Sequence, residues 1–535
     1  MLFRILCIWL MFTGMVVSDQ KPISIDGSFD DWEGVTPHYV DAFGDADNSG
    51  FDFGRLWLAD DDDFLFIRIE TATEDNWNNN TNVRLYIDTD LDGTTGMPIG
   101  GIGAELEWRF GEGMGFLHAG EPTEILGSAI RLRGGPTITP KQIELAIGRE
   151  SKLAQDLLFA SNGIRILVHD TASGDQIPES GELLDYQFDE GELPPETIIP
   201  ISRDEESDLR MMTHNVLFDR PWNSTFEPSF GRQWQAVNPD ILNFQEIYDN
   251  TAEETIELVS RWVPLAKGET WYAAQRSDCV TVSRYPILNS WALNGNLAVL
   301  IDASEKVGTE ILVVNAHLPC CGNDGSRQAE IDRIMSFIRD AKSSLNGVSL
   351  APGTPIFITG DLNLVRLSQQ LTSLIDGDIV NQEFGAGFDP DWDGTSLRNI
   401  ISRQTEKRMG YTWRFDGGLF WPGQLDYTIF SDSVMELGNH FILFTPEIEN
   451  PGELGLQLND SLVSDHFVLC TDFRPQSNFI LGDLNNDQMT DLLDVGPFVE
   501  VLAEGGFLIQ ADVNEDGTFD LLDVMPFIDI LNDAG

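Results

Sequence analysis

A chain of 535 residues is too long for one hydrophobic core, so we expect two to four domains. The hydrophobic share of 42% excludes a mainly disordered chain. A formal net charge of −56 gives a polyanionic partner no long-range attraction to the surface. The acidity has two explanations at this point, solubility in a salty medium and cation binding by clustered carboxylates.

Residues 1–18 have the pattern of a secretory signal peptide. Arg4 supplies the positive region, residues 5–17 form an apolar stretch too short for a comfortable membrane span, and cleavage is expected after Ser18. The alternative is an uncleaved anchor. No later stretch approaches about 20 apolar residues, so we expect a secreted or cell-surface protein with no membrane span after cleavage.

Residues 19–190 read mostly as strands, and we expect a β-sandwich there. Phe64–Ile69 and Val83–Ile87 are short β-rich runs between clusters of Asp, Asn and Gly, which supply turns. The loop after the second run carries alternating acids that are predicted to bind a cation. These are Asp88, Asp90 and Asp92. A proline-rich acidic stretch, residues 191–204, is expected to be a linker.

Short motifs in this first domain resemble those of family-nine-like carbohydrate-binding modules. The residues concerned are Ile25-Asp26-Gly27, Asp30-Asp31-Trp32, the acidic loop and Thr95-Gly96. The resemblance implies a glycan partner, with Trp32, Trp57, Trp77 and Trp108 stacking on sugar rings. The alternative is that these tryptophans belong to the core of the sandwich.

From Leu209 to about Arg474 apolar strand-like runs alternate with amphipathic helical stretches, which predicts an α/β layered domain over residues 205–474. The predicted strands are Met211–Phe218, Ile241–Phe244, Ile311–Ala316 and Ile356–Thr359, and a helix is predicted over Arg327–Lys342. Each apolar run has an acid, an amide or an imidazole beside its end, where layered α/β proteins assemble sites. These residues are Asn215, Glu246, His317, Asp361, Asn363, Asp426, Asp465 and His466.

The surrounding residues resemble the motifs of the endonuclease/exonuclease/phosphatase superfamily, also called deoxyribonuclease-I-like. The motifs are Gln245-Glu246, Gly360-Asp361-Leu362-Asn363, Tyr411-Thr412-Trp413, Leu425-Asp426-Tyr427 and Ser464-Asp465-His466. His317 stands where the hydrolase branch of that family carries a second histidine. The resemblance covers about half of the chain and implies a four-layer α/β sandwich that hydrolyses phosphoester bonds with a divalent cation.

A hard cation such as Mg²⁺ (or Mn²⁺) prefers carboxylate oxygen and polarises a phosphoryl oxygen as a Lewis acid. Glu246 is therefore the expected direct ligand, with Asp465 and Asn215 beside it. Asp361 and Asn363 are expected to position the nucleophile and the phosphate.

The two histidines are expected to move protons. His466 is the predicted general base on water, and the resemblance gives Asp426 as its orienting partner. His317 would protonate the leaving group or hydrogen-bond the phosphate, although the sequence leaves open which histidine is the base. The acid that partners His317 in family nucleases is either Asp278 or missing.

The cysteines that follow the signal are Cys279, Cys320, Cys321 and Cys470, an even number that permits disulfides in an exported protein. Cys320 and Cys321 are adjacent and follow a predicted catalytic histidine. They form either a vicinal disulfide or two free thiols.

Residues 475–535 contain two copies of one unit, offset by 29 residues, with thirteen acids and no Lys or Arg. Oxygen-bearing residues at positions 1, 3, 5, 9 and 12 of each loop predict two Ca²⁺ sites. The ligands are Asp483, Asn485, Asp487, Asp491 and Asp494 in the first copy, and Asp512, Asn514, Asp516, Asp520 and Asp523 in the second. The alternative is a pair of acidic turns without metal.

The repeat resembles a dockerin type I repeat, which implies a cohesin-like or cell-surface partner. We expect two short antiparallel helices to pack through apolar residues of both copies. These are Leu492, Leu493, Val495 and Phe498, and then Leu521, Leu522, Val524 and Phe527.

The sequence therefore predicts a secreted, metal-dependent phosphoesterase with accessory modules. An inactive scaffold and a cell-surface glycan-binding protein are the alternatives. The substrate, whether DNA, RNA, a lipid head group or a small phosphoester, stays open.

Overall fold

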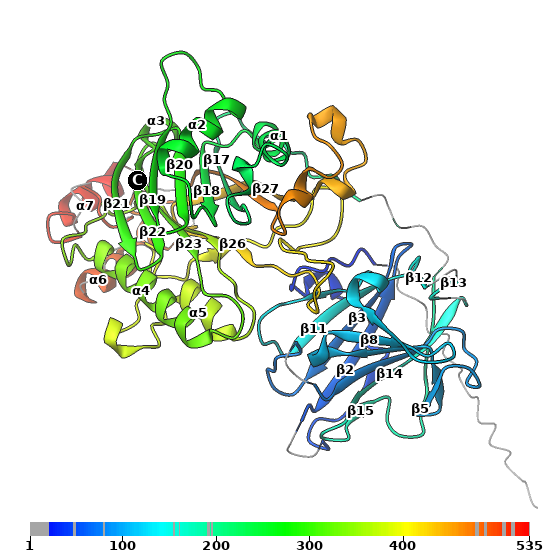
Figure 1. Cartoon of the computed structure of the whole chain (residues 1–535). Helices are drawn as coiled ribbons and strands as arrows, with labels where there is room; N and C mark the ends of the chain where they lie inside the picture. Colours follow the sequence, from blue (N-terminus) through cyan, green and yellow to red (C-terminus); the bar gives the residue numbers. More distant parts are fainter. Residues whose placement is uncertain are drawn as a thin grey trace, which may run out of the picture.

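The computed structural model describes residues 21–46, 50–78, 81–153, 156–159, 161–189, 193, 196–476, 481–485, 489–504, 510–514 and 519–533. The predicted signal peptide and the predicted calcium ligands Asp487 and Asp516 lie outside these residues. Within them, no helix combines the length and the hydropathy needed to cross a membrane. The prediction of several domains built mainly from sheets is confirmed (Figure 1).

The first domain is a sandwich of two antiparallel sheets. One sheet has the order β1 (Tyr39–Val40), β2 (Phe53–Asp60), β3 (Phe64–Thr71), β11 (Gln142–Gly148), β10 (Arg133–Gly135). The other has the order β15 (Gln176–Ile177), β14 (Gly163–Asp170), β4 (Val83–Asp88), β7 (Leu106–Arg109), β8 (Met114–Leu117), β9 (Thr123–Leu126), with β16 (Leu184–Gln187) also on β14. Two small hairpins join β5 (Met97–Ile99) to β6 (Ile102–Ala104) and β12 (Lys152–Leu153) to β13 (Asp156–Leu157).

Strand β3 shows why this sandwich does not stand apart from the rest of the chain. Its side chains alternate between two faces, as in any strand, but both faces are apolar. Leu65 and Ile67 point into the core of the sandwich, whereas Phe64 and Phe66 pack in a second cluster with Met409 and other residues of the central domain. A strand that is apolar on both faces is buried on both faces.

The central domain has two six-stranded sheets. The first has the order β19 (Tyr272–Arg276), β20 (Cys279–Ser283), β18 (Ile241–Gln245), β17 (Leu209–Asn215), β28 (Val468–Pro475), β27 (Met435–Leu443). The second has the order β21 (Ile287–Leu293), β22 (Asn296–Asp302), β23 (Glu310–His317), β24 (Ile356–Asp361), β26 (Asp426–Phe430), β25 (Arg398–Asn399). Most neighbours are antiparallel, but β17 with β18 and β23 with β24 are parallel.

Each of these sheets carries helices on its outer face (Figure 1). α1 (Glu227–Val237) and α2 (Ala252–Trp262) share a core with the first sheet, whereas α4 (Asp324–Lys342) and α5 (Ser368–Asp376) share one with the second. A third cluster, including Met211, Val313 and Phe357, fills the space between the sheets. The short helix α3 (Ser304–Val307) follows β22.

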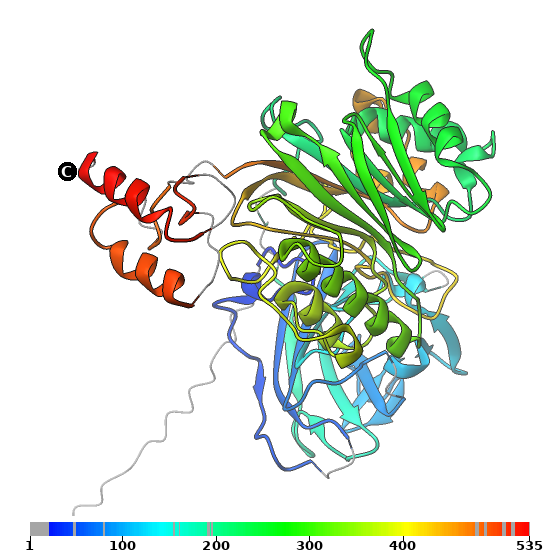
Figure 2. The ribbon, with the colours of Figure 1, turned by 90° about the vertical axis from the view of Figure 1, so that its left-hand side faces the viewer.

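The C-terminal segment forms helices α6 (Val495–Glu504) and α7 (Val524–Asp533), which lie together at one side of the molecule (Figure 2). Phe498 and Phe527, which occupy equivalent places in the repeat, stack with ring centroids 4.1 Å apart and are 2% and 3% exposed. The expectation that both leucine pairs also pack between the helices is wrong. Leu492, Leu493, Leu521 and Leu522 are 80%, 67%, 76% and 66% exposed.

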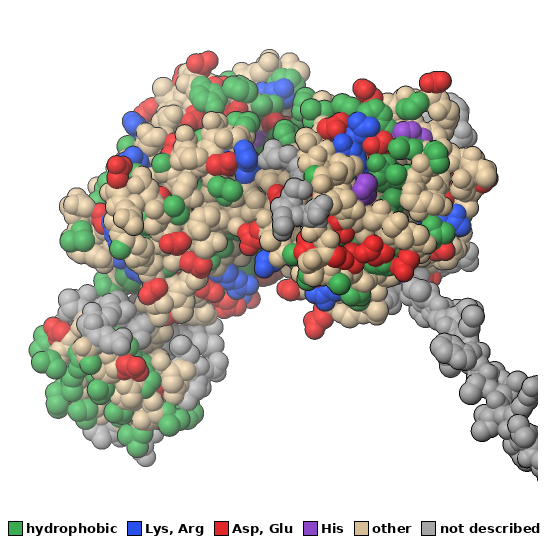
Figure 3. Space-filling view, turned by 90° about the horizontal axis from the view of Figure 1, so that it is seen from below, with side chains coloured by type: hydrophobic (Ala, Val, Ile, Leu, Met, Phe, Trp, Pro, Cys, Tyr) green, Lys and Arg blue, Asp and Glu red, His purple; other side chains and the backbone are tan. Residues whose placement is uncertain are grey.

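The reason is their position before the helices. Each leucine pair precedes the first helical residue, in the turn between two aspartates whose carboxylates accept backbone hydrogen bonds. That turn directs the pairs outward, and Figure 3 shows green hydrophobic side chains over the lobe at lower left where this segment lies.

Candidate active site

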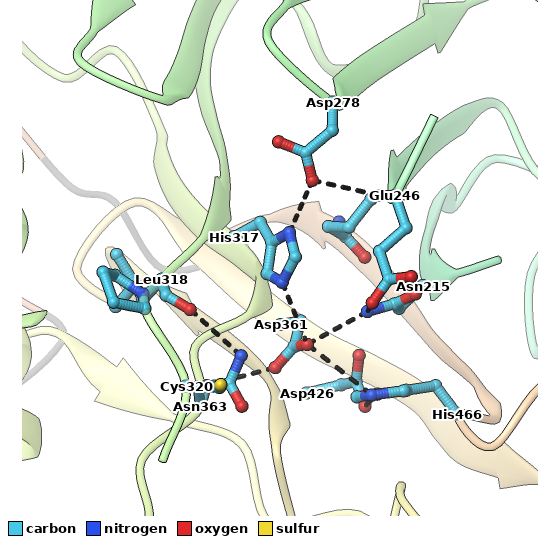
Figure 4. A network of polar contacts seen from close by, with 12 residues as sticks. Asn215, Glu246, Asp278, His317, Leu318, Cys320, Asp361, Asn363, Asp426 and His466 are labelled. Carbon is cyan, nitrogen blue, oxygen red and sulfur yellow. Dashed lines mark hydrogen bonds and ion pairs between the residues drawn. The ribbon is translucent and has the colours of Figure 1, made fainter. Parts of the chain in front are cut away.

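The edges of the two central sheets bring the predicted polar residues together. The parallel pairs place the ends of β17 and β18, and of β23 and β24, at the same edge of their sheets. His317 is the register partner of Asp361, which is in turn the partner of Asp426, so the three residues form a row across the second sheet. Figure 4 shows the cluster that results.

A close backbone contact fixes that row. Gly360 has a φ of +135°, and a Cβ atom there would lie 2.0 Å from the carbonyl oxygen of Ala316 on the neighbouring strand. Only glycine tolerates both conditions. The Gly-Asp pair thus aims the Asp361 side chain at the edge of the sheet.

The first histidine has the carboxylate partner that the sequence left open. His317 Nδ1 lies 2.5 Å from Asp278 Oδ2, and Asp278 lies in the turn between β19 and β20. Burial opposes the charged imidazole, but the hydrogen bond to Asp278 and the charge of Asp361 outweigh it and raise the pKa of His317 to about 9. Burial would raise the pKa of Asp278, but the bond to His317 outweighs it and holds that pKa below its ordinary value.

The second histidine has the predicted partner. His466 Nδ1 lies 2.8 Å from Asp426 Oδ2, and both side chains are buried. Burial disfavours the imidazolium, whereas the charges of Asp426 and Asp361 favour it more strongly, so the pKa of His466 rises to about 10.

The Tyr411-Thr412-Trp413 segment supports this pair. The Thr412 hydroxyl oxygen accepts hydrogen bonds from the backbone N–H groups of Leu425 and Asp426, at 3.0 and 2.9 Å. Trp413 Nε1 donates to Asp465 Oδ2 at 3.0 Å. One short segment therefore positions two of the site acids.

Asp361 lies between the two histidines. Its Oδ2 atom is 3.6 Å from Nε2 of His317 and 3.6 Å from Nε2 of His466, and it accepts a hydrogen bond from Asn215 Nδ2 at 3.1 Å. Burial raises the pKa of Asp361, and the two histidines oppose that rise. Two imidazoles thus converge, from opposite sides, on a single buried carboxylate.

The remaining predicted residues surround this group. Glu246 accepts hydrogen bonds from Asn215 Nδ2 and from the backbone N–H of Phe218, both at 3.0 Å. It has a φ of 65°, an uncommon conformation for a non-glycine residue. Asn363 Nδ2 donates to the carbonyl oxygen of Leu318 at 3.0 Å.

The types of donor at this site suit a hard divalent cation, although the carboxylate oxygens of Glu246, Asp361 and Asp465 do not all lie within 4.8 Å of one another. Glu246, Asp465, Asn215 and Asp361 offer carboxylate and amide oxygens, the ligands that Mg²⁺ or Mn²⁺ prefers. Asp465 Oδ1 is buried and has no hydrogen-bond partner among the described residues. A negatively charged oxygen is therefore left without a donor or a cation.

A cavity of about 680 Å³ opens beside these residues. Glu246, His317, Asp361, Asp465 and His466 line it, whereas Asn215 and Asp426 are fully buried behind its wall. Cys320 and Cys321 also line the cavity as exposed free thiols, with their Sγ atoms 2.6 Å apart. Cys279 and Cys470 are buried free thiols.

The acidic loop of the β-sandwich differs from its prediction. Ligand atoms of Asp88 and Asp90 lie within 4.8 Å of one another and of Glu105, not of Asp92. Asp92 instead accepts hydrogen bonds from the backbone and hydroxyl of Thr94. The alternating spacing of acids does not identify Glu105, because the β5–β6 hairpin brings it back to the loop that carries Asp88 and Asp90.

The predicted sugar-stacking tryptophans are all core residues. Trp32, Trp57, Trp77 and Trp108 are 1%, 4%, 2% and 1% exposed. Trp77 and Trp108 lie in the core of the sandwich, whereas Trp32 and Trp57 lie in the cluster that the sandwich shares with the central domain. A buried ring leaves no face for a sugar, so none of the four is a sugar-stacking residue.

The loops of the C-terminal repeat close in the same way in both copies. Asp494 Oδ1 accepts hydrogen bonds from the N–H groups of Leu484 and Asn485, and Asp523 Oδ1 accepts one from Asn514. Asp483, Asp494, Asp512 and Asp523 are buried. Calcium binding by these loops stays a prediction.

Neither a protein-family model nor a curated protein matches the chain. Solved structures are similar over about half of the chain. They include the human Nocturnin catalytic domain (16% identity, 52% of this chain and 100% of that one, TM-score 0.32) and ANGEL2, a 2′,3′-cyclic phosphatase (14%, 51% and 97%, TM-score 0.36). A third is an endonuclease/exonuclease/phosphatase family protein from Leptotrichia buccalis (13%, 50% and 99%, TM-score 0.32). Because these TM-scores are low, the function of this chain has to be inferred from its own residues.

Proposed function

We propose that this chain is a divalent-metal-dependent phosphoesterase that hydrolyses phosphodiester bonds. The observation that carries the proposal is the pair of Asp–His couples, Asp278–His317 and Asp426–His466, whose free Nε2 atoms both lie 3.6 Å from one oxygen of Asp361. Hydrolysis needs one group that takes a proton from water and another that supports the departing oxygen. Two oriented imidazoles at opposite sides of one carboxylate supply both.

His466 is the better candidate for the base. Its side chain is 6% exposed against 18% for His317, and Asp426 behind it is fully buried. Asp426 fixes the orientation of the ring through Nδ1 and stabilises the imidazolium that forms when Nε2 accepts a proton from water. His317 faces the cavity, where its N–H donates to the phosphate or to the departing oxygen.

Glu246, Asp465 and Asn215 would hold the cation, and Asp361 lies beside them. Bound there, Mg²⁺ or Mn²⁺ supplies Lewis-acid stabilisation of the phosphoryl charge and favours the neutral form of nearby imidazoles. Asp361, between the two Nε2 atoms, would position the water nucleophile and the phosphate. Asn363 donates a hydrogen bond to the carbonyl oxygen of Leu318, and both residues line the cavity in which the phosphate would bind.

Three further parts of the proposal concern the rest of the molecule. The N-terminal pattern supports secretion, the carboxylates of the repeat support calcium binding, and the exposed leucine pairs support a protein partner such as a cohesin-like or cell-surface protein. A glycan partner loses its main support because the four tryptophans are buried.

The proposal is tested with a substrate panel on the full chain. Bis(p-nitrophenyl) phosphate, p-nitrophenyl phosphate and p-nitrophenyl acetate are compared in Mg²⁺, in Mn²⁺ and after chelation. We expect turnover of bis(p-nitrophenyl) phosphate with either metal and loss of that turnover after chelation. Turnover of the acetate alone, or phosphoester turnover that survives chelation, would overturn the proposal.

A further inference from the structure

The β-sandwich and the central domain, called the catalytic half below, share one continuous apolar interface. Trp421, from the loop between Trp413 and Leu425, is 4% exposed and belongs to the core of the sandwich, where its ring centroid lies 6.1 Å from that of Phe110 in edge contact. The backbone of Ile25 pairs with this half through bonds of 2.9 Å to Arg408 and 2.7 Å from Gly410. The sandwich is therefore packed on the catalytic half and is not a tethered module.

The same interface reaches the cavity. Asn78 and Thr137 of the sandwich line it directly. The Thr137 hydroxyl donates to the carbonyl oxygen of Leu364 at 2.6 Å, and the N–H of Thr139 donates to that of Arg366 at 2.5 Å. Residues 364–366 follow Asn363, so the sandwich holds the segment next to a site residue.

The cavity wall is mainly apolar beyond the catalytic groups. Phe218 and Tyr248 stack at 5.6 Å on the catalytic side and are 69% and 49% exposed, and Phe420 is 60% exposed on the loop that the sandwich holds. Among the described residues lining the cavity, Arg366 is the only Lys or Arg, and its Nε lies 3.2 Å from Asp324. With a chain charge of −56, little counter-charge is available for more than one phosphate.

We infer that the β-sandwich is an integral wall of the active site, and that the cavity it completes selects a phosphodiester bearing one uncharged apolar group, seated against Phe420 and near Asn78. This inference rests on the proposed function. Exposed aromatic rings beside a charged site favour such a group because its burial removes apolar surface of both partners from water. A second anionic group would meet acidic surroundings without a partner.

The test compares three diesters that share the p-nitrophenolate leaving group. The second substituent is methyl, phenyl or carboxyphenyl. For the full chain in Mg²⁺ we expect kcat/KM for the phenyl ester to exceed that for the methyl ester by about tenfold or more, and the added carboxylate to cancel most of that gain. Phe420→Ala removes an exposed ring from the wall and Asn78→Asp places a charge on the sandwich side of it, so each should lower the phenyl-to-methyl ratio.

Phe43→Ala is the matched control, since Phe43 is a 52% exposed phenylalanine of the sandwich outside the cavity lining. It should leave the ratio unchanged. Equal rates for phenyl and methyl esters, a preference for the carboxyphenyl ester, or an unchanged ratio in Phe420→Ala would overturn the inference while leaving phosphodiester hydrolysis standing.

A binding measurement separates the two proposals. Diphenyl phosphate and dimethyl phosphate are titrated while tryptophan fluorescence is followed, because Trp413 and Trp421 line the cavity. If diphenyl phosphate binds at least about tenfold more tightly than dimethyl phosphate and no ester is hydrolysed, the proposed function is contradicted and the selectivity is supported. If the two phosphates bind equally and the phenyl and methyl esters are hydrolysed at equal rates, only the selectivity is contradicted.

Discussion

His317 Nδ1 lies 2.5 Å from Asp278 Oδ2, which gives the more exposed histidine of the site a fixed orientation and a raised pKa of about 9. Asp278 is a positioning residue, since it reaches the reacting atoms through the imidazole. Asp278→Asn should lower the pKa of His317 and shift the pH profile of turnover toward lower pH. We expect turnover to fall by about tenfold to a hundredfold.

NMR titration of the His317 ring together with the pH profile checks this prediction. A merely structural role would reduce stability and leave both pKa readouts in place. Asp62→Asn, an exposed acid of the sandwich, is the control.

Glu246→Ala should abolish the metal response. Removing the carboxylate deletes a proposed ligand, so we expect a loss of at least about 100-fold in turnover and a weaker half-saturation for Mg²⁺. Circular dichroism should show that the variant is folded. Glu253→Ala, an exposed acid on α2, should behave as wild type. A Glu246→Ala protein with wild-type turnover at every Mg²⁺ concentration would remove this residue from the site.

His214 should make the fold sensitive to acid. It is fully buried, accepts a hydrogen bond from Trp234 Nε1 at 3.3 Å, and burial lowers its pKa to about 3. Because this lies below the ordinary value of about 6.5, the unfolded chain binds more protons between those values. The stability that the neutral ring contributes is complete above about pH 6.5 and is lost as the pH falls, by up to about 1.4 kcal/mol per pH unit.

The measurement is urea unfolding of wild type and His214→Phe at pH 7, 6 and 5. The difference in free energy of unfolding between the two proteins should shift steadily in favour of the variant as the pH falls. A difference that stays constant across this range would rule out the neutral, acid-sensitive histidine.

The C-terminal repeat should fold on calcium and be separable from catalysis. Thirteen acids without a base repel one another, and two bound ions would remove four charges and satisfy the converging oxygens. A 475–535 fragment should show little helix by circular dichroism in EDTA and clear helix in millimolar Ca²⁺. A chain ending at Arg474 should keep its turnover. Helicity that does not depend on calcium would contradict folding on calcium. Loss of turnover in the truncated chain would contradict the separation from catalysis.

Much of the fold was accessible from the sequence because apolar runs and helical spacing are local properties. The predicted runs at Ile311–Ala316 and Ile356–Thr359 lie within β23 and β24, and the helix predicted from Arg327 begins at Asp324. The site residues can be identified because they lie beside the ends of such runs, Asp465 and His466 before theirs and the others after. The strand Met211–Phe218 was predicted too long, since β17 ends at Asn215, where the chain turns into the site.

Other features depend on contacts between distant segments. Asp278 is only one of two alternatives in the sequence, because its contact with His317, 39 residues away, depends on the fold, and Glu105 returns to the acidic loop through a hairpin. The packing of Trp421 in the core of the sandwich joins segments about 300 residues apart, and no local pattern encodes it. Similarly, the leucine pairs of the repeat were read as core residues because hydropathy does not show which way a turn directs a side chain.

The central claim is that phosphodiester hydrolysis occurs where His317 and His466 converge on Asp361, and Asp361→Asn tests it most directly. The asparagine keeps the shape of the side chain but removes its charge, and Asp302→Asn on the end of β22 is the matched control. The measurement is kcat/KM for bis(p-nitrophenyl) phosphate in Mg²⁺, with the thermal midpoint recorded for each protein. We predict a fall of at least about 100-fold in Asp361→Asn alone, with a thermal midpoint no lower than that of wild type. Wild-type turnover in a folded Asp361→Asn protein would contradict the account.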